Sequence, residues 1–224
     1  MHKKAVIFDF DGVLADTTPL HVQAWKRTFA EVDYDFTYED YISKASGWGR
    51  EEAIKNVLPS SDEATITFLS QRKHEHFAAV FSENSLDPAK GALTLLAKLQ
   101  QQNIPLAVAS SSRFASILVK ELGLSEFFTV VVTAQDVTKQ KPDPELFLLA
   151  AKRLSIEPSS CLVIEDAISG IQAAKNAKMH VIGVLGTDKN IAAAADITVN
   201  TLEEHDKILA YLENLPSPHL QPEK

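Results

Sequence analysis

Charged and hydroxyl side chains follow short apolar runs at several places in this sequence. They are Asp9 and Asp11 after the run 5–8, Ser110 after 104–109, Lys141 in the proline-flanked loop 141–144, and Glu165 and Asp166 after 161–164. Apolar runs of this length are typical of buried strands, and the carboxyl ends of parallel strands meet at one edge of a sheet. We therefore expect these side chains to lie close together.

Such a set of groups is suited to chemistry at phosphorus. Asp9, Asp11 and Asp166 would form an oxygen-rich pocket for a hard cation such as Mg²⁺. One carboxylate can attack phosphorus and form an aspartyl-phosphate, while a second protonates the leaving oxygen and later activates the acceptor. Ser110 and Lys141 would hold the phosphate oxygens. Each residue alone is common in turns and on surfaces, but their joint occurrence at successive strand ends favours an enzyme.

The elements that would position these groups alternate along the second part of the chain. Further apolar runs lie at 127–133, 180–185 and 197–199, and leucine-rich or isoleucine-rich stripes at helical spacing lie between them, at 93–99, 117–124, 146–154 and 168–174. Alternating strands and helices predict a parallel sheet with helices on both faces. The expected fold class is thus α/β with a Rossmann-like sheet.

The segment 16–87 breaks this alternation, because it has helical patterns at 20–29, 38–43, 51–58 and 64–81 and no strong strand signal. We interpret it as a small α-helical cap inserted after the first strand. The predicted domains are a catalytic core formed by 1–15 and 88–224, and a cap at 16–87. The end of the chain, 214–224, contains prolines and little apolar content, so we expect a mobile tail.

Four segments resemble the signature motifs of the haloacid dehalogenase (HAD) superfamily. They are 8–17 (Phe-Asp-Phe-Asp-Gly-Val-Leu-Ala-Asp-Thr), 109–112, 141–144 and 164–171. The resemblance extends to about residue 186, and the early helical insert is similar to the small cap of that superfamily. It implies an enzyme with the HAD core fold.

The resemblance also implies residue roles. Asp9 would be the nucleophile and Asp11 the acid/base. Mg²⁺ would be held by Asp9, the backbone carbonyl of Asp11 and Asp166, with Glu165 nearby. The other two catalytic residues, Ser110 and Lys141, would bind the transferring phosphoryl group.

Within the superfamily, the chain is most similar to the β-phosphoglucomutase branch and its related sugar-phosphate phosphatases. This likeness rests on the first cap helix, on 47–50, on 72–73 and on 112–113. It implies contacts with the far phosphate and sugar and, for His21, help with proton control; Thr17 would sit at the hinge where the cap begins. The implied substrate-binding residues are Thr17, His21, Trp25, Gly47, Arg50, Lys73, Ser111, Ser112 and Arg113.

The sequence departs from the mutase pattern at four positions. Ser46 stands where the mutase has a Lys, Ala53 where it has a small hydroxyl residue, Phe114 where it has an Asn, and Lys90 where it has a Pro. Losing the Lys and the Asn removes two polar contacts to a second phosphate or sugar. We therefore expect a phosphatase on a small phosphorylated sugar or polyol, with a sugar-phosphate mutase as the alternative.

Two other classes of protein share some of these features. A phospho-accepting signalling receiver also uses Asp, Mg²⁺, a hydroxyl and a Lys, but it places its Asp on a middle strand and has no helical insert. A binding protein on an inactive enzyme scaffold is not favoured, since all four motifs are intact.

Composition and net charge limit the expected cellular location and binding partners. The formal net charge of −8 argues against wrapping a nucleic-acid backbone. The single cysteine, Cys161, excludes an intramolecular disulfide and is typical of a small buried residue. No apolar run approaches the length of a membrane span. We expect a cytoplasmic monomer that binds a small phosphorylated metabolite, with no nucleic-acid or membrane partner.

Overall fold

The computed structural model describes residues 3–186 and 189–216. The chain folds into two compact units, one formed by 1–15 and 88–224 and the other by 16–87. The assignment of these units as catalytic core and cap is functional and stays a prediction. Of the expected mobile tail, residues 217–224 lie outside the described part of the chain.

The first unit contains a six-stranded parallel sheet in the order β3-β2-β1-β4-β5-β6. The strands are β1 (Ala5–Phe8), β2 (Leu106–Ser110), β3 (Val130–Thr133), β4 (Cys161–Glu165), β5 (His180–Val184) and β6 (Ile197–Val199). The expected parallel α/β sheet is confirmed. Because the strand order reverses at β1, the connections that lead to β2 and β3 and those that lead to β4 and β5 run over opposite faces of the sheet. The carboxyl ends of β1, β2 and β4 meet at this switch point.

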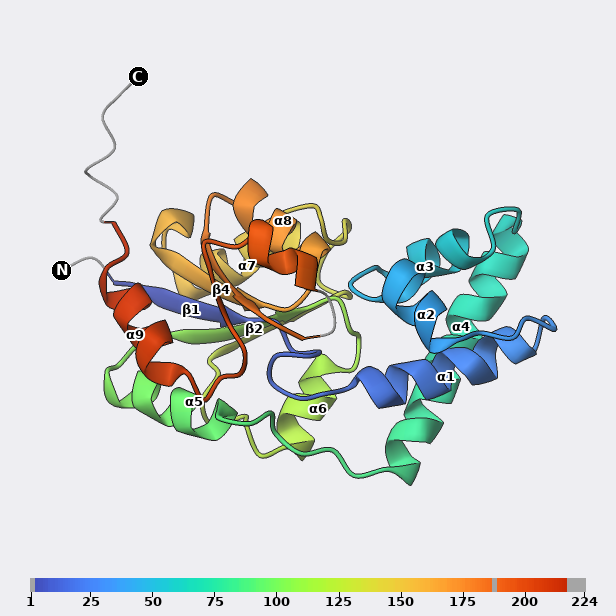
Figure 1. Ribbon diagram of the computed structural model, residues 1–224, viewed down its shortest axis with the longest axis horizontal. Helices are drawn as coiled ribbons and strands as arrows, with labels where there is room; N and C mark the ends of the chain where they lie inside the picture. Colours follow the sequence, from blue (N-terminus) through green and yellow to red (C-terminus); the bar gives the residue numbers. More distant parts are fainter. Residues whose placement is uncertain (1–2, 187–188, 217–224) are drawn as a thin grey trace, which may run out of the picture. The chain divides into compact units, whose positions relative to one another are not determined.

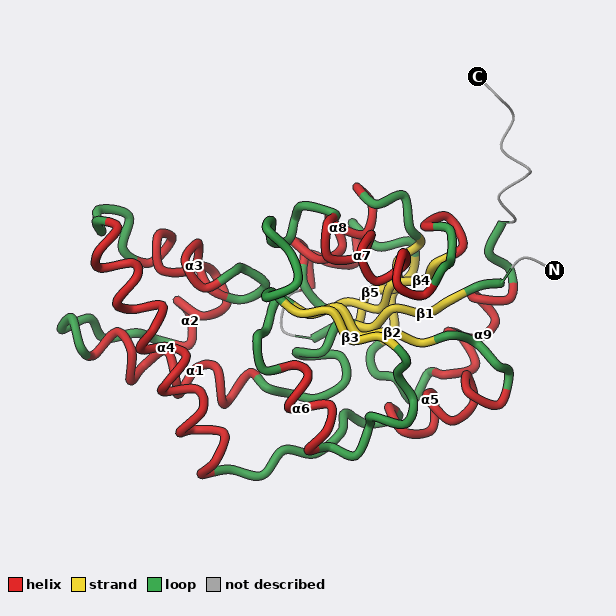
Figure 2. Tube along the Cα trace, turned by 180° about the vertical axis from the view of Figure 1, so that it is seen from behind, coloured by secondary structure: helices red, strands yellow, loops and turns green. Residues whose placement is uncertain are grey.

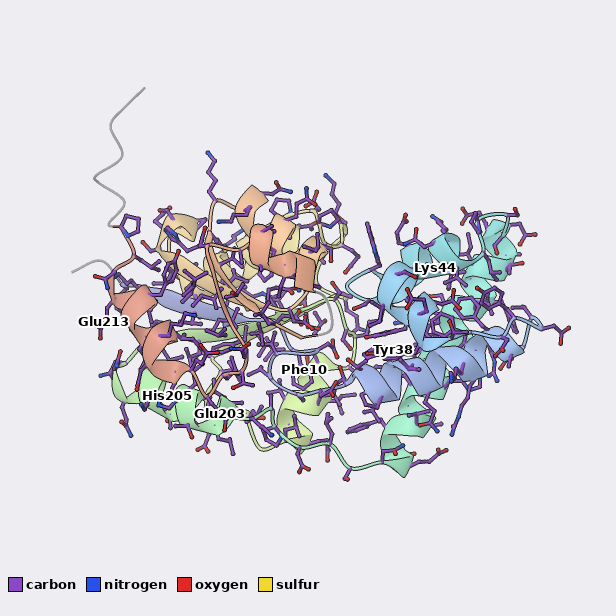
Figure 3. The ribbon with its side chains drawn as sticks, viewed as in Figure 1. Phe10, Tyr38, Lys44, Glu203, His205 and Glu213 are labelled. Atoms are coloured by element: carbon purple, nitrogen blue, oxygen red, sulfur yellow. The ribbon has the colours of Figure 1, made fainter. Side chains whose placement is uncertain are left out.

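Helices cover both faces of this sheet. Helices α7 and α8 lie on one face, and α5, α6 and α9 lie on the other, in both views (Figures 1 and 2). Their bounds are α5 (Ala92–Gln101), α6 (Ala115–Glu121), α7 (Glu145–Leu154), α8 (Ile168–Asn176) and α9 (His205–Glu213); Figure 3 labels the first and last residues of α9. Short 3₁₀ turns occupy Pro158–Ser160 and Lys189–Ala193.

Strands β1 and β4 are buried at every residue. Ile7 and Val163 pack with Phe147 of α7 and Ile171 of α8 in one apolar cluster. Since both faces of a parallel sheet are covered, its central strands read as continuous apolar runs. The strand that delivers the first acidic pair is therefore held in the centre of the sheet.

Two predicted strand starts are wrong. The run 104–109 begins as a strand only at Leu106, because the Ile104 amide donates to the Leu99 carbonyl and closes the end of α5. The run 127–133 begins only at Val130. Phe127 donates to the Leu124 carbonyl in a turn, so its apolar character reflects packing and not strand pairing.

The second unit is helical throughout its regular structure. It contains α1 (Thr18–Ala30), α2 (Tyr38–Asp40), a π-helical turn at Tyr41–Ala45, α3 (Arg50–Val57) and α4 (Glu63–Glu83). Its core is rich in aromatic rings, with Phe29 stacked on Phe36 at 5.0 Å between ring centroids. Across the described residues, no helix is both long and apolar enough to cross a membrane.

Candidate active site

Asp9 is the first residue after β1 and is almost fully buried. Its amide donates to the Ile164 carbonyl of β4 at 2.9 Å, which fixes the backbone beside the neighbouring strand. Its Oδ1 accepts from Lys141 Nζ at 2.5 Å. The predicted nucleophile is thus anchored on one side by its strand and on the other by a cation.

Lys141 joins two carboxylates that come from different strands. Besides Asp9, its Nζ donates to Glu165 Oε1 at 2.7 Å, and it lies 4.9 Å from the centroid of the Phe147 ring. The second oxygen of Glu165 accepts from the Ala167 amide at 2.6 Å. Glu165 therefore holds Lys141 in place, and its predicted part in a metal site stays a prediction.

The loop after β1 is closed by its own backbone. The Phe10 carbonyl accepts from the Leu14 amide at 2.9 Å, and the Gly12 amide donates to the Ala15 carbonyl at 2.8 Å. Gly12 has φ +79°, and a Cβ placed on it would overlap the Asp166 carboxylate. A glycine is needed here both for the left-handed backbone and for the close approach of Asp166.

Asp11 and Ser110 bring the ends of β1 and β2 together. The Ser110 hydroxyl donates to Asp11 Oδ2 at 3.2 Å and accepts from the Ser112 amide at 3.0 Å. The Ser111 hydroxyl is shielded from solvent and has no hydrogen-bond partner among the described residues. A buried hydroxyl without a partner is costly unless a ligand satisfies it. Arg113, another predicted binding residue, is exposed.

The carboxylates of this group repel one another. Burial raises the pKa of Asp9 to about 8, against the lowering effect of Lys141 and together with repulsion from Glu165 and Asp11. Burial and repulsion from Glu165 and Asp9 also raise the pKa of Asp166. Burial disfavours the Lys141 ammonium, but Asp9 and Glu165 raise its pKa above the usual value. The single positive charge of Lys141 does not offset the negative charge of all these buried carboxylates.

This excess of buried oxygen charge fits a hard divalent cation. Among the residues described, no three His, Cys, Asp or Glu side chains are arranged as a ready metal-binding group. The predicted ligand set for Mg²⁺ uses two side chains, Asp9 and Asp166, and the backbone carbonyl of Asp11. Such a set leaves room for water and phosphate oxygens, as is usual for Mg²⁺.

In the second unit, His21 and Lys73 form a polar pair surrounded by aromatic rings. The two side chains lie 3.3 Å apart, Nζ to Nδ1. Because an ammonium has no lone pair, Lys73 is the donor of this contact. Lys73 Nζ lies 4.9 Å from the Trp25 ring centroid and 4.7 Å from that of Phe77. Trp25 itself packs in the core of the unit.

The other predicted substrate-binding residues of this unit lie near the starts of α1 and α3. Thr17 is buried and precedes α1, and its carbonyl accepts from the His21 amide at 2.9 Å. Gly47 has φ +75°. Arg50 is the first residue of α3, and its Nη1 donates to the Ser70 carbonyl of α4 at 2.8 Å.

Comparison with known proteins decides the family. The profile of the Haloacid dehalogenase-like hydrolase family matches residues 6–184. The chain belongs to this family. The HAD enzymes similar to it include the β-phosphoglucomutase of Bacillus subtilis (strain 168), 32% identical over 95% of this chain and 100% of the relative. The phosphorylated carbohydrates phosphatase of Thermotoga maritima is 32% identical over 95% and 99%.

A solved HAD structure shares the fold. The β-phosphoglucomutase of Clostridium difficile superposes with a TM-score of 0.85, at 28% identity, over 94% of this chain and 97% of that one. The similarity to the β-phosphoglucomutase and sugar-phosphate phosphatase branch is confirmed. The chain is thus an enzyme of the HAD family, and its relatives include a phosphoglucomutase and a phosphatase of phosphorylated carbohydrates.

Two features of this HAD site were not expected from the sequence. One is the bond between Glu165 and Lys141, and the other is the packing of Gly12 and Gly170 against acidic side chains. The single glycine in each of the motif segments 8–17 and 164–171 offered a signal, but only the folded chain shows what each glycine makes room for.

Proposed function

We propose that this protein is a Mg²⁺-dependent phosphatase that acts on a small phosphorylated sugar or polyol through an aspartyl-phosphate at Asp9. The observation that carries the proposal is the buried Asp9 carboxylate at the end of β1, 2.5 Å from Lys141 and beside the Asp11–Ser110 pair. A nucleophile, an acid/base and donors for phosphate oxygens thus come from neighbouring strand ends.

In the first step, a carboxylate oxygen of Asp9 attacks phosphorus. The bond from that oxygen to phosphorus forms as the bond to the leaving oxygen breaks, and Asp11 gives its proton to the leaving oxygen. In the second step, water attacks the phosphorus of the aspartyl-phosphate while Asp11 takes its proton. Inorganic phosphate leaves and the Asp9 carboxylate is restored.

Lys141 and the hydroxyl groups of the β2 loop would stabilise the transferring group. The Lys141 charge is fixed at Asp9 by Glu165, and donors held in place before the reaction stabilise developing charge at little reorganisation cost. Ser110 and Ser111 would donate to phosphoryl oxygens. The shielded Ser111 hydroxyl would then gain a partner.

Asp9, Asp166 and the Asp11 carbonyl would hold Mg²⁺, with Glu165 beside them. When bound, this cation would favour the ionised carboxylates and polarise a phosphoryl oxygen. The raised pKa values of Asp9 and Asp166 support such a role, because they reflect charge that a cation would offset.

We assign substrate binding away from the reacting phosphoryl group to residues of the second unit. His21, Lys73 and Arg50 offer the donors for sugar hydroxyls or a distant anion, with Thr17, Trp25 and Gly47 shaping their surroundings. In the first unit, Ser112 and Arg113 would add contacts beside the β2 loop. We also propose that the enzyme is a monomer of the cytoplasm.

Water, and not a sugar hydroxyl, is the acceptor that we favour. Ser46 and Phe114 lack the charged and amide groups expected for a second phosphate, and Ala53 is fully buried in the apolar core of its unit. A mutase remains the second candidate, supported by the similarity to the Bacillus subtilis β-phosphoglucomutase.

The decisive experiment is a phosphate-release screen over phosphorylated sugars, polyols and nucleotides with Mg²⁺, alongside an isomerisation assay with β-glucose 1-phosphate. We expect release of phosphate from a sugar or polyol phosphate, loss of release with a chelator, and no turnover by Asp9→Asn. The variant should keep the native circular dichroism spectrum. Isomerised product without released phosphate would establish the mutase instead, and retained turnover by Asp9→Asn would refute the assigned nucleophile.

A further inference from the structure

Gly170 lies in the first turn of α8 and is buried against the side chain of Glu165. A Cβ built on Gly170 would overlap Oε1 and Cδ of Glu165 and lie 2.7 Å from its Cγ. Non-bonded carbon atoms pack at about 3.5–4.0 Å. An alanine at this position would therefore force the Glu165 side chain to move.

Glu165 has little freedom to move without losing its bonds. It is 1% exposed, its Oε1 accepts from Lys141, and its Oε2 accepts from the Ala167 amide. Displacing the carboxylate would weaken at least one of these interactions inside a buried site. The nearest consequence is for Lys141, because the same carboxylate is one of its two anionic partners.

We propose that Gly170 is a positioning residue for Lys141. Its missing side chain leaves the space in which Glu165 holds the ammonium against Asp9. Only the kinetic part of this inference rests on the proposed function, since the packing of Gly170, Glu165 and Lys141 can be tested without any substrate.

Gly170 allows a cleaner test than Gly12, which also packs against a carboxylate. Gly12 has φ +79°, so any side chain there would be strained by the backbone itself. Gly170 lies within a helix and has no positive φ. On helix propensity alone, alanine at 170 would raise stability, so a loss would report the contact with Glu165.

The experiment compares Gly170→Ala in the natural chain with the same change in a Glu165→Ala background, by thermal unfolding with a chelator present. We expect Gly170→Ala to lower Tm in the natural chain and to raise Tm when Glu165 is absent. This reversal of sign is the mark of a direct contact between the two positions. A Gly170→Ala chain that fails to fold, while the double variant folds, would support the same conclusion.

The kinetic part uses the best substrate from the screen. We expect Gly170→Ala to lower kcat by about a hundredfold, as for a small misplacement of a catalytic group, with KM little changed. In the Glu165→Ala background the same substitution should cause no further loss of kcat. Equal Tm losses in both backgrounds, or an unchanged kcat in the natural chain, would overturn the inference. If the natural chain hydrolyses no phosphate ester, the proposed function fails while the Tm comparison still decides the contact.

Discussion

Each unit of the protein contains a buried aspartate paired with a lysine, yet the two pairs differ electrostatically. In the first unit, Asp9 lies 2.5 Å from Lys141, and in the second, Asp40 lies 2.6 Å from Lys44. The pKa of Asp9 is raised to about 8, whereas the pKa of Asp40 is lowered well below its usual range. Distance to the cation therefore does not determine the sign of the shift.

The hydrogen-bond donors around Asp40 lower its pKa by more than burial raises it. Burial raises its pKa, but hydrogen bonds from Lys44, from the Thr37 amide and hydroxyl, and from the Tyr34 hydroxyl lower it. Figure 3 labels Lys44, the lysine of this pair, and Tyr38, the first residue of α2. Asp40 and Thr37 also form a capping box at the start of α2. This aspartate is a structural group whose charge is fully satisfied.

Asp9 is in the opposite situation. Burial is the largest influence on its pKa, its lysine is shared with Glu165, and the neighbouring carboxylates add repulsion. A buried charge with too few polar partners is typical of binding and catalytic sites, because a bound ligand can supply the missing partners. The comparison separates a pair that stabilises the fold from a pair to which we assign the proposed chemistry.

The largest effect is expected for Lys141→Met. The substitution leaves Asp9 and Glu165 facing each other without a cation, which costs about 3–5 kcal/mol of unfolding free energy when a buried pair is broken. Loss of a fixed charge at the reacting group should also lower kcat by about 10²–10³-fold. Urea unfolding and steady-state kinetics measure the two effects.

Lys139→Met is the matched control for that variant. Lys139 lies in the same loop, but its side chain is 70% exposed, so we expect a change within about 0.5 kcal/mol. If both variants lose the same stability, the Lys141 pairs are not what holds this site together.

Asp9→Asn should stabilise the metal-free protein at alkaline pH. A carboxyl with a folded pKa near 8 and an unfolded pKa of about 3.9 favours the folded state less and less as pH rises between these values. Above pH 8 the ionised Asp9 carboxylate therefore lowers the unfolding free energy of the natural chain, and the neutral asparagine of the variant does not. We expect a gain of about 1–3 kcal/mol there, as for relieved active-site strain.

The pH dependence of that gain provides the check. Below about pH 4, where Asp9 is protonated in both folded and unfolded chains, the gain should disappear. Thermal unfolding with a chelator at pH 4, 6 and 8.5 measures it. A loss of stability at pH 8.5 would mean that Asp9 is satisfied as Asp40 is.

Asp40→Asn should have the opposite sign. Its carboxylate has a depressed folded pKa, so its contribution is present above the unfolded pKa of about 3.9 and is lost as pH falls through the folded value. We expect a loss of about 1–2 kcal/mol at pH 7, the usual size for a capping group, and a smaller loss near pH 3. Glu39→Gln, on the exposed neighbour, should leave stability unchanged; equal losses would remove the special role of Asp40.

Much of this contrast lies beyond what the sequence can predict. The continuous apolar runs at β1 and β4 predict central parallel strands, because only strands covered on both faces have that composition. The run 127–133 led to a wrong prediction of where β3 begins. Phe128 is buried, with its ring 5.9 Å from that of Phe8, but it does not lie in a strand. Apolar residues indicate burial more directly than they indicate strand pairing.

The same distinction holds for the site. The order of Asp9, Ser110, Lys141 and Asp166 along the chain predicts which groups meet, because strand ends share one edge of a sheet. The sequence does not predict that Lys141 is divided between two carboxylates, or that Gly170 is in contact with one of them. Those facts depend on side-chain packing between segments that are far apart in the chain.

Lys44→Met tests the weaker half of the comparison and should have the smallest effect. The Lys44 side chain is 38% exposed and four residues from Asp40 on the chain, so we expect only a small loss of unfolding free energy. Asp40 would keep its bonds from Thr37 and Tyr34. Because exposed charges are screened by salt, the loss should shrink between low and high ionic strength, whereas the loss in Lys141→Met should persist. Urea unfolding of both variants at two salt concentrations checks this, and a Lys44 effect as large and as salt-resistant as that of Lys141 would show that burial does not separate the two pairs.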